Sequence, residues 1–192
     1  NRMKRACLAF ALLAAPAATL ADPDLTADTA QARAMAGKLV SQVGAALQKE
    51  MAAGGPVAAI GVCSQVAPEI AGNLSRETGS RVTRISLKTR NPMIGTPDAW
   101  EQAALAEFDR RAAGGEAPDG LERAEVVDEP GGRVFRYLKA IPVKPVCLAC
   151  HGADDAIAPA IRDKLRETYP HDRATGYGLG QIRGAVSIKK PL

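Results

Sequence analysis

The stretch LERAEVVDEPGGRVFRYLKAIPV, residues 121–143, sets the architecture of this chain. Its two halves, residues 121–128 and 133–143, flank the turn Glu129-Pro130-Gly131-Gly132. Proline and glycine between two strand-like runs are typical of a β-hairpin. The sequence therefore predicts an antiparallel sheet that is built around this hairpin.

Regular patterns on both sides of the hairpin complete the domain. Apolar residues recur at helical spacing or alternate at strand spacing, and proline or glycine separates the segments. Helices are predicted at residues 28–53, 57–66, 96–112 and 158–168, and strands at residues 81–89 and around Val186 and Ile188. Pro68 is expected to break or restart the second helix. Helices between strands predict an α+β domain with a long N-terminal helix.

The N-terminus has the pattern of a secretory signal peptide. Met3-Lys4-Arg5 precedes an alanine-rich apolar run, and small residues lead to Ala21. The run is short and is interrupted by Pro16, which disfavours a membrane-spanning helix. We expect cleavage after Ala21, a single exported domain over residues 22–192, a periplasmic location and no transmembrane segment once the signal is removed.

The charge of the chain gives no sign of a nucleic-acid partner. The formal net charge is +4, and loss of Arg2, Lys4 and Arg5 with the signal peptide lowers it to about +1. Such a weak charge provides no electrostatic attraction to a polyanion. We therefore expect no binding to nucleic acid.

The cysteine count is the most informative feature of the composition. Of four cysteines, Cys7 lies in the predicted signal peptide, which leaves Cys63, Cys147 and Cys150 in the exported chain. An odd number of thiols in an oxidising compartment needs an explanation. Cys147 and Cys150 belong to the motif Cys-Leu-Ala-Cys-His that ends at His151, which is the spacing that attaches c-type haem.

This spacing has a chemical reason. Two thiols add to the two vinyl groups of one porphyrin, and the histidine after the second thiol is thereby held under the iron. The motif predicts one haem c per chain, bound covalently by Cys147 and Cys150, with His151 as the proximal iron ligand. Prolines before the motif and a glycine after it predict an irregular loop around the porphyrin edge.

Three other interpretations of the motif compete with haem. A zinc site lacks a second close pair of ligands, because only Cys63 and His171 stand elsewhere in the exported chain. A redox-active dithiol is expected in a βαβ setting, whereas a proline-rich loop precedes this pair. A structural disulfide leaves His151 unexplained. The sequence favours haem.

The residues alone leave the sixth iron ligand open. Histidine, methionine and cysteine can all ligate haem iron, so the candidates are His171, Met35, Met51, Met93 and Cys63. Cys63 combines an apolar segment with an otherwise unexplained thiol. Its alternative role is that of a small buried side chain, which is common for free cysteine.

An ordered set of segments resembles a known family, the haem-c-binding domains with a PAS-like fold, long described only as a domain of unknown function. Members occur as stand-alone exported proteins and as sensor modules of bacterial signalling receptors. The resemblance covers nearly all of the exported chain. Besides the haem motif, the segments that resemble the family are Cys63–Ala71, Ile85–Lys88, Arg90–Pro92, Pro97–Glu101, Asp172–Tyr177 and Arg183–Ser187.

The resemblance implies a PAS-like antiparallel sheet flanked by helices and a haem held by histidine on one side and cysteine on the other. On this chain the implied ligands are His151 and Cys63. One departure is Met93-Ile94-Gly95, where the family often has a second asparagine shortly after Arg-Asn-Pro. This difference makes Met93 a rival ligand.

Three more residues are candidates for the haem pocket. Arg90 and Asn91 are placed to hold a haem propionate, since guanidinium pairs well with carboxylates, or else they form a solvated strand end. Tyr177 either packs its ring on the porphyrin or belongs to the ordinary core.

Two functions of different classes follow from these residues. The first is a redox or small-gas sensor that binds carbon monoxide or nitric oxide and signals through a separate protein. The second is a periplasmic electron-transfer protein with an unidentified redox partner. Peroxidase chemistry needs an open iron site with an acid–base group, for which the sequence offers no clear pair, so we expect no enzymatic activity.

Overall fold

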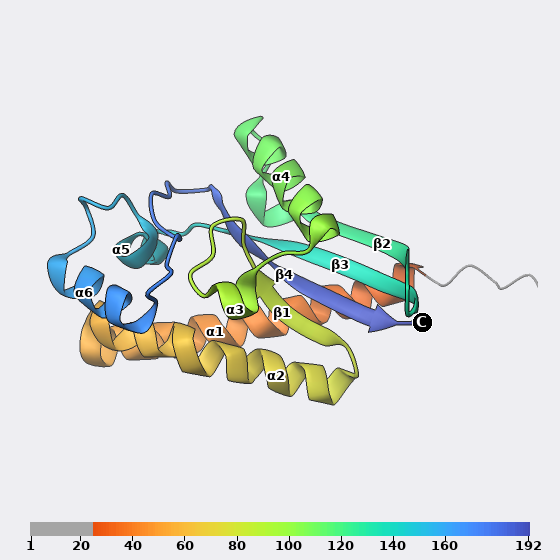
Figure 1. Cartoon of the computed structure of the whole chain (residues 1–192), viewed down its shortest axis with the longest axis horizontal. Helices are drawn as coiled ribbons and strands as arrows, with labels where there is room; N and C mark the ends of the chain where they lie inside the picture. Colours follow the sequence, from red (N-terminus) through yellow and green to blue (C-terminus); the bar gives the residue numbers. More distant parts are fainter. Residues whose placement is uncertain (1–24) are drawn as a thin grey trace, which may run out of the picture.

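A computed structural model describes residues 25–192, and the predicted signal peptide, residues 1–21, lies outside them. One four-stranded antiparallel sheet, in the order β1-β4-β3-β2, lies between helices (Figure 1). Two helices follow one face, and a third crosses the other. The predicted α+β architecture is confirmed.

The elements run along the chain as follows. The helices and helical turns are α1 (Leu25–Gly61), the π-helical turn η1 (Val62–Val66), α2 (Ala67–Thr78), α3 (Pro92–Gly95), α4 (Ala99–Ala113), the 3-10 turns η2 (Pro118–Gly120) and η3 (Pro145–Cys147), α5 (Leu148–His151) and α6 (Pro159–Thr168). The strands are β1 (Arg81–Ile85), β2 (Glu122–Glu129), β3 (Gly132–Pro142) and β4 (Ile182–Pro191).

The predicted hairpin is confirmed and joins β2 to β3. The two strands pair from Glu122 opposite Lys139 to Glu129 opposite Gly132. Gly132 has a φ of 122°, a region that side chains disfavour, so a glycine suits the turn. β3 then pairs with β4 on its other side, which places β3 inside the sheet and β2 at its edge.

Alternating side chains of the strands fill two core layers. Phe135 and Tyr137 of β3 pack with α1 and α2, whereas Leu138 packs with α4 on the opposite face. A third cluster joins the end of α1 to α6 through Ile60, Ile161 and Leu165, and Cys150 packs against it. The sheet is therefore covered on both faces, and the third cluster lies beyond its end.

The break predicted at Gly54-Gly55-Pro56 is present as a kink within α1. Gly55 has the non-helical angles φ 71° and ψ −169°, and Pro56 follows it. Pro68 restarts the helix as expected, because it lies in the first turn of α2. Between these helices the chain forms the π-helical turn that contains Cys63.

One helical run also has the length and composition of a membrane span. The run Leu25–Thr78 has a mean hydropathy of 1.2 over 18 residues, although the sequence analysis expected no such segment after the signal. Only 22% of that window is buried in the domain. Ala32, Ala36 and Leu39 of the same run are fully buried against the sheet, so α1 contributes to the core.

Two predictions of local structure are wrong. β1 ends at Ile85 rather than at Thr89, because the Ser86 hydroxyl bonds to the backbone N–H and carbonyl of Lys88 and turns the chain. Leu87, expected on a buried face, is therefore exposed. The haem motif, expected in an irregular loop, instead forms the helical turn α5.

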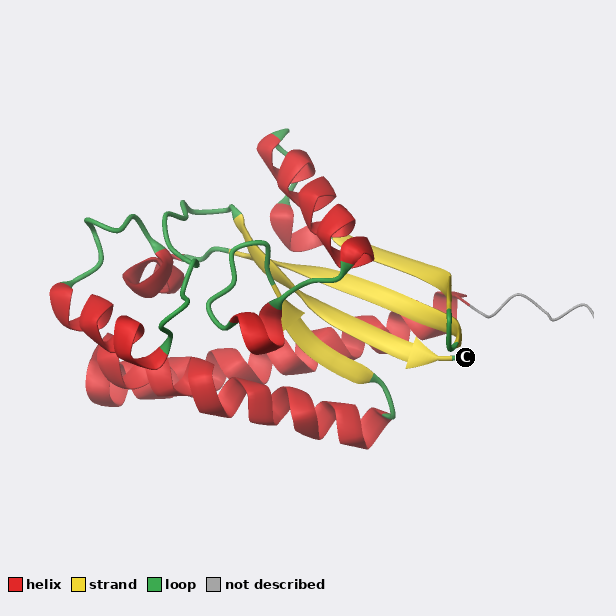
Figure 2. Ribbon diagram, viewed as in Figure 1, coloured by secondary structure: helices red, strands yellow, loops and turns green. Residues whose placement is uncertain are grey.

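The loops after β1 and β3 and before β4 gather at the end of the sheet opposite the C-terminus, beside α5 and α6 (Figure 2). The kinked end of α1 and the start of α2 lie at the same end (Figure 1). The fold thus brings the two predicted ligand segments, which are distant in sequence, to one place.

Candidate functional site

A helical turn presents the Cys-Leu-Ala-Cys-His motif at the end of β3. Val143 N–H donates to the carbonyl of Gln181, and Gly180 N–H donates to the carbonyl of Val143, which fixes the approach to the motif. The turn closes with Gly152 N–H donating to the carbonyl of Leu148 at 3.0 Å. A Cβ at residue 152 would lie 2.6 Å from that carbonyl oxygen, so only glycine fits.

His151 is held in one tautomer. Its Nδ1 lies 2.6 Å from the carbonyl oxygen of Ala174. Because a carbonyl only accepts hydrogen bonds, Nδ1 carries the proton and Nε2 keeps its lone pair. In metal-binding histidines, the ring nitrogen that does not bind the metal usually donates such a hydrogen bond, which orients the imidazole. His151 is therefore prepared to bind a metal through Nε2.

The surroundings of His151 also keep it neutral. Burial lowers the pKa of His151 to about 2, and the positive charges of Arg183 and Arg90 act in the same direction. The Nε of Arg183 lies 3.1 Å from Nδ1 and 3.4 Å from Nε2 of the ring. A donor in the plane of the ring cannot lie this close to both nitrogens, so the Arg183 guanidinium lies over the face of the ring and leaves the Nε2 lone pair free. A neutral imidazole is the form that ligates iron.

The fold brings Cys63 to the motif. Cys63, Cys147 and Cys150 are all free and half-buried thiols. Burial raises the pKa of the Cys150 thiol, Arg90 opposes that rise, and the charges of Cys63 and Cys147 add to it. Cys63 and Cys147 are therefore each within electrostatic range of Cys150. That these residues hold one haem stays a prediction.

Cys63 lies in an unusual element. The π-helical turn Val62–Val66 joins α1 to α2, and Ala67 N–H donates to the carbonyl of Val62 at its end. Single π-helical turns inside helices are rare and are frequent at functional sites. The turn gives Cys63 a position that a continuous α-helix would not provide.

The three predicted pocket residues have well-defined contacts. Arg90 is buried and bonds to Asp172 and to the carbonyl of Cys150. Asn91 accepts from the N–H of Met93 and so caps α3. The Tyr177 ring lies edge-on to His151, with 6.3 Å between ring centroids. Contact of these three side chains with haem stays a prediction.

The rival sixth ligands lie in varied surroundings. Met93 is 89% exposed on α3. His171 is exposed in the loop after α6, and Met35 packs half-buried under the sheet. Met51 is half-buried on α1. Among these candidates, Cys63 is the one whose charge raises the pKa of the Cys150 thiol.

Sequence reasoning missed two arginines of the site. Arg183 bonds to the Ser86 hydroxyl and the carbonyl of Lys88, and it packs against His151. Arg84 is half-buried on β1, and its charge also lowers the pKa of His151 after the larger effects of burial, Arg183 and Arg90. The sequence analysis named Arg183 only as the first residue of a segment that resembles the family. A basic residue in a strand gives no signal of its own.

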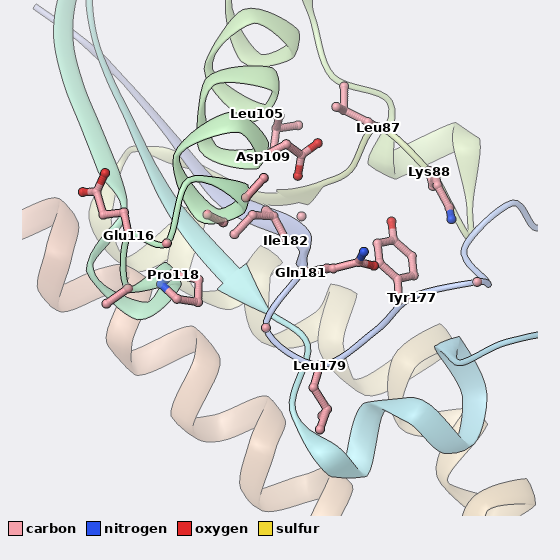
Figure 3. A pocket seen from close by; sticks show the side chains of 17 residues that line it. Leu87, Lys88, Leu105, Asp109, Glu116, Pro118, Tyr177, Leu179, Gln181 and Ile182 are labelled. Carbon is pink, nitrogen blue, oxygen red and sulfur yellow. The ribbon is translucent and has the colours of Figure 1, made fainter.

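A pocket of about 740 Å³ opens next to this site (Figure 3). It lies between the C-terminal half of α4 and the glycine-rich loop before β4, and Tyr177 belongs both to its lining and to the contact with His151. Its size is in the range of small-molecule sites, about 300–1,000 Å³. Asp109 faces it, and burial raises the pKa of that carboxyl group.

The residues present fit a c-type haem. Two free thiols stand at the attachment spacing, the adjacent imidazole is neutral with Nε2 available, and a third thiol lies in range. Within residues 25–192, no three His, Cys, Asp or Glu side chains converge as ligands of a bare metal ion.

Comparison with known proteins gives the family of the chain. No curated protein sequence matches it. The crystal structure of the cyanobacterial heme-protein Tll0287 is similar, with a TM-score of 0.62 and 24% identity over 89% of this chain and 97% of that chain. At this identity the likeness establishes the fold. The model of the Tll0287-like family matches residues 21–191, which is almost the whole sequence and confirms the resemblance. The chain therefore belongs to the Tll0287-like family.

Proposed function

We propose that this protein is an exported haem c domain that acts in the periplasm as a redox or small-gas sensor and not as an enzyme. The observation that carries the proposal is the meeting of Cys147, Cys150, His151 and Cys63 at one end of the sheet. The family match and the likeness to a protein described as a heme-protein support the cofactor.

Each of these residues has a distinct role. Cys147 and Cys150 hold the porphyrin by thioether bonds, and His151 ligates the iron through Nε2. Cys63 ligates the opposite side as thiolate. When bound, haem c provides a centre that exchanges electrons and binds small gases.

Two features favour sensing over electron transfer. A thiolate prefers ferric iron. Reduction of the iron would therefore weaken its bond to the Cys63 sulfur and raise the tendency of that sulfur to take up a proton. Cys63 also lies in a π-helical turn between two long helices, next to the kink at Gly55. Release of Cys63 would let this turn relax and shift α1 against α2, which is a two-state output for a partner protein.

Gas binding by the reduced protein tests this function. We expect reduced protein to bind carbon monoxide, because Cys63 leaves, and oxidised protein to exclude added ligands. The midpoint potential should be low and should fall with rising pH, because the departing thiolate takes up a proton. Reduced protein that ignores carbon monoxide and exchanges electrons rapidly would overturn the sensor and leave the electron-transfer protein as the function.

A further inference from the structure

A buried ion pair braces the loop that holds His151. Arg90 Nε donates to Oδ2 of Asp172 at 3.1 Å, and the two side chains are only 8% and 13% exposed. The other oxygen of Asp172 accepts from Ala174 N–H at 2.8 Å. Asp172 thereby fixes the backbone at the residue whose carbonyl receives the His151 proton.

Arg90 contacts both sides of the same site. Its Nη2 donates to the carbonyl of Cys150 at 2.6 Å and to the carbonyl of Ala174 at 3.3 Å. One guanidinium therefore ties the residue before His151 to the residue that accepts from His151. No other buried arginine of residues 25–192 bonds to this pair of carbonyls.

Backbone hydrogen bonds hold the same loop on both edges. Arg173 N–H donates to the carbonyl of Thr89 at 2.9 Å, next to Arg90. On the other edge, Gly176 and Tyr177 donate to the carbonyls of Gly152 and His151 at 2.7 and 2.9 Å. The loop from Asp172 to Tyr177 is thus fastened between the segment after β1 and α5, and the Arg90–Asp172 ion pair braces its first residue.

Stability alone is a poor explanation for such a pair. Burial removes both charges from water, and a buried ion pair often contributes no more stability than apolar residues of similar volume. Its clear effect is geometric, because the planar fork of arginine reaches several acceptors in fixed directions. Partners of this kind that orient a metal-binding histidine affect the metal strongly without touching it.

We propose that Arg90 and Asp172 are positioning residues that fix the orientation and the Nδ1 proton of the His151 imidazole through the carbonyl of Ala174. This inference rests on the proposed role of His151 as iron ligand, and it assigns to Arg90 a task other than propionate binding. Lysine retains the charge at residue 90 but lacks the fork that reaches Asp172, Cys150 and Ala174 together. Asparagine at residue 172 retains the shape but removes the charge.

The test compares Arg90→Lys and Asp172→Asn with wild type in the mature haem-loaded protein. The first readout is the exchange rate of the His151 Nδ1 proton by NMR, and the second is the electron paramagnetic resonance spectrum of ferric haem, which depends on the orientation of the imidazole plane. We expect about tenfold faster exchange and shifted resonance positions in both variants. Arg136→Lys is the matched control, because Arg136 is equally buried and pairs with Asp98 beneath α4.

Wild-type exchange and wild-type resonance positions in both variants would overturn the positioning role. Loss of the fold in both variants, or equal changes in Arg136→Lys, would also overturn it, since the pair would then be a general stabiliser. Failure of the proposed function is a separate result, namely a wild-type protein without haem. In that case the proton exchange of His151 in the haem-free chain still decides whether Arg90 and Asp172 position the ring.

Discussion

His151 and Cys63 are the two proposed iron ligands, and they are held in different ways. The His151 ring is fixed by a carbonyl at Nδ1 and by three surrounding arginines that favour its neutral form. Cys63 is half-buried in the π-helical turn between α1 and α2. The histidine side of the site is therefore the rigid side.

Replacement of Cys63 by alanine should change the iron site without removing the haem. Loss of an anionic donor disfavours ferric iron, so the midpoint potential should rise by roughly 0.1 V or more, and the ferric absorption spectrum should change. A redox titration followed by absorption measures both. Ser64→Ala is the control for a change within the same turn, where the Ser64 side chain bonds to the carbonyl of Gly61 and to Tyr169. Unchanged potential and spectrum in Cys63→Ala would return the ligand role to Met93 or His171.

Gly152→Ala should distort the turn that carries His151. The added methyl group would lie 2.6 Å from the Leu148 carbonyl oxygen, and relief of that overlap should cost about 1–3 kcal/mol of stability and reduce haem attachment. Thermal unfolding and the ratio of haem to protein measure the two effects. Gly120→Ala provides the control, since its new Cβ meets nothing within 4 Å. Equal behaviour of the two variants would contradict this account of α5.

Among the elements, the contact between α1 and β2 links the long helix to the edge of the sheet. Arg33 Nε donates to Glu122 at 3.0 Å, and the Tyr137 hydroxyl donates to the same carboxylate at 2.8 Å. The hydrogen bond from Arg33 holds the pKa of Glu122 below its ordinary value of 4.5, and the Tyr137 bond also lowers it, while burial opposes both. The charged carboxylate is therefore favoured in the folded chain.

This contact predicts a pH dependence of stability. Because the unfolded chain binds the Glu122 proton more tightly, the stabilisation is full above pH 4.5 and is lost as the pH falls through the lower folded pKa. Glu122→Gln should cost about 1–2 kcal/mol at pH 7, and its difference from wild type should shrink in acid. Urea unfolding at several pH values measures this. Glu167→Gln, in an exposed pair on α6, should change stability by less than about 0.5 kcal/mol. A difference for Glu122→Gln that is independent of pH would contradict the assignment.

Local sequence signals predicted most of the elements. The hairpin, the helix that Asp98 caps and the break at Gly55 depend on neighbouring residues, and each is present. The end of β1 was missed because the side chain of Ser86, and not a glycine or proline, turns the chain. The turn α5 was missed because flanking prolines suggested an irregular loop.

The contacts of the site were less predictable than its residues. The motif predicted its two cysteines and His151 directly, because attachment chemistry fixes their spacing, whereas Cys63 was one of several candidates until the family resemblance singled it out. The bonds of Arg90 to Asp172 and to Ala174 span more than eighty positions, so no local pattern marks them. The π-helical turn likewise follows from the packing of α1 against α2 and α6 and has no sequence signature of its own.

The whole molecule separates its scaffold from its site. Two core layers cover the sheet, while α5, the loops and the kinked end of α1 meet beyond one end of it. The pocket beside Tyr177 lies at the same end.

Covalent attachment of haem is the central claim of this account, and the denatured protein tests it most directly. The chain, produced in a host that exports and matures c-type cytochromes, is unfolded and extracted with acid acetone, and its pyridine haemochrome spectrum is recorded. We predict a c-type spectrum and one haem per chain that stays with the polypeptide, with no attachment when Cys147 and Cys150 are both replaced by alanine. Haem that extracts freely from the wild-type chain, or a chain that matures without haem, would contradict the account.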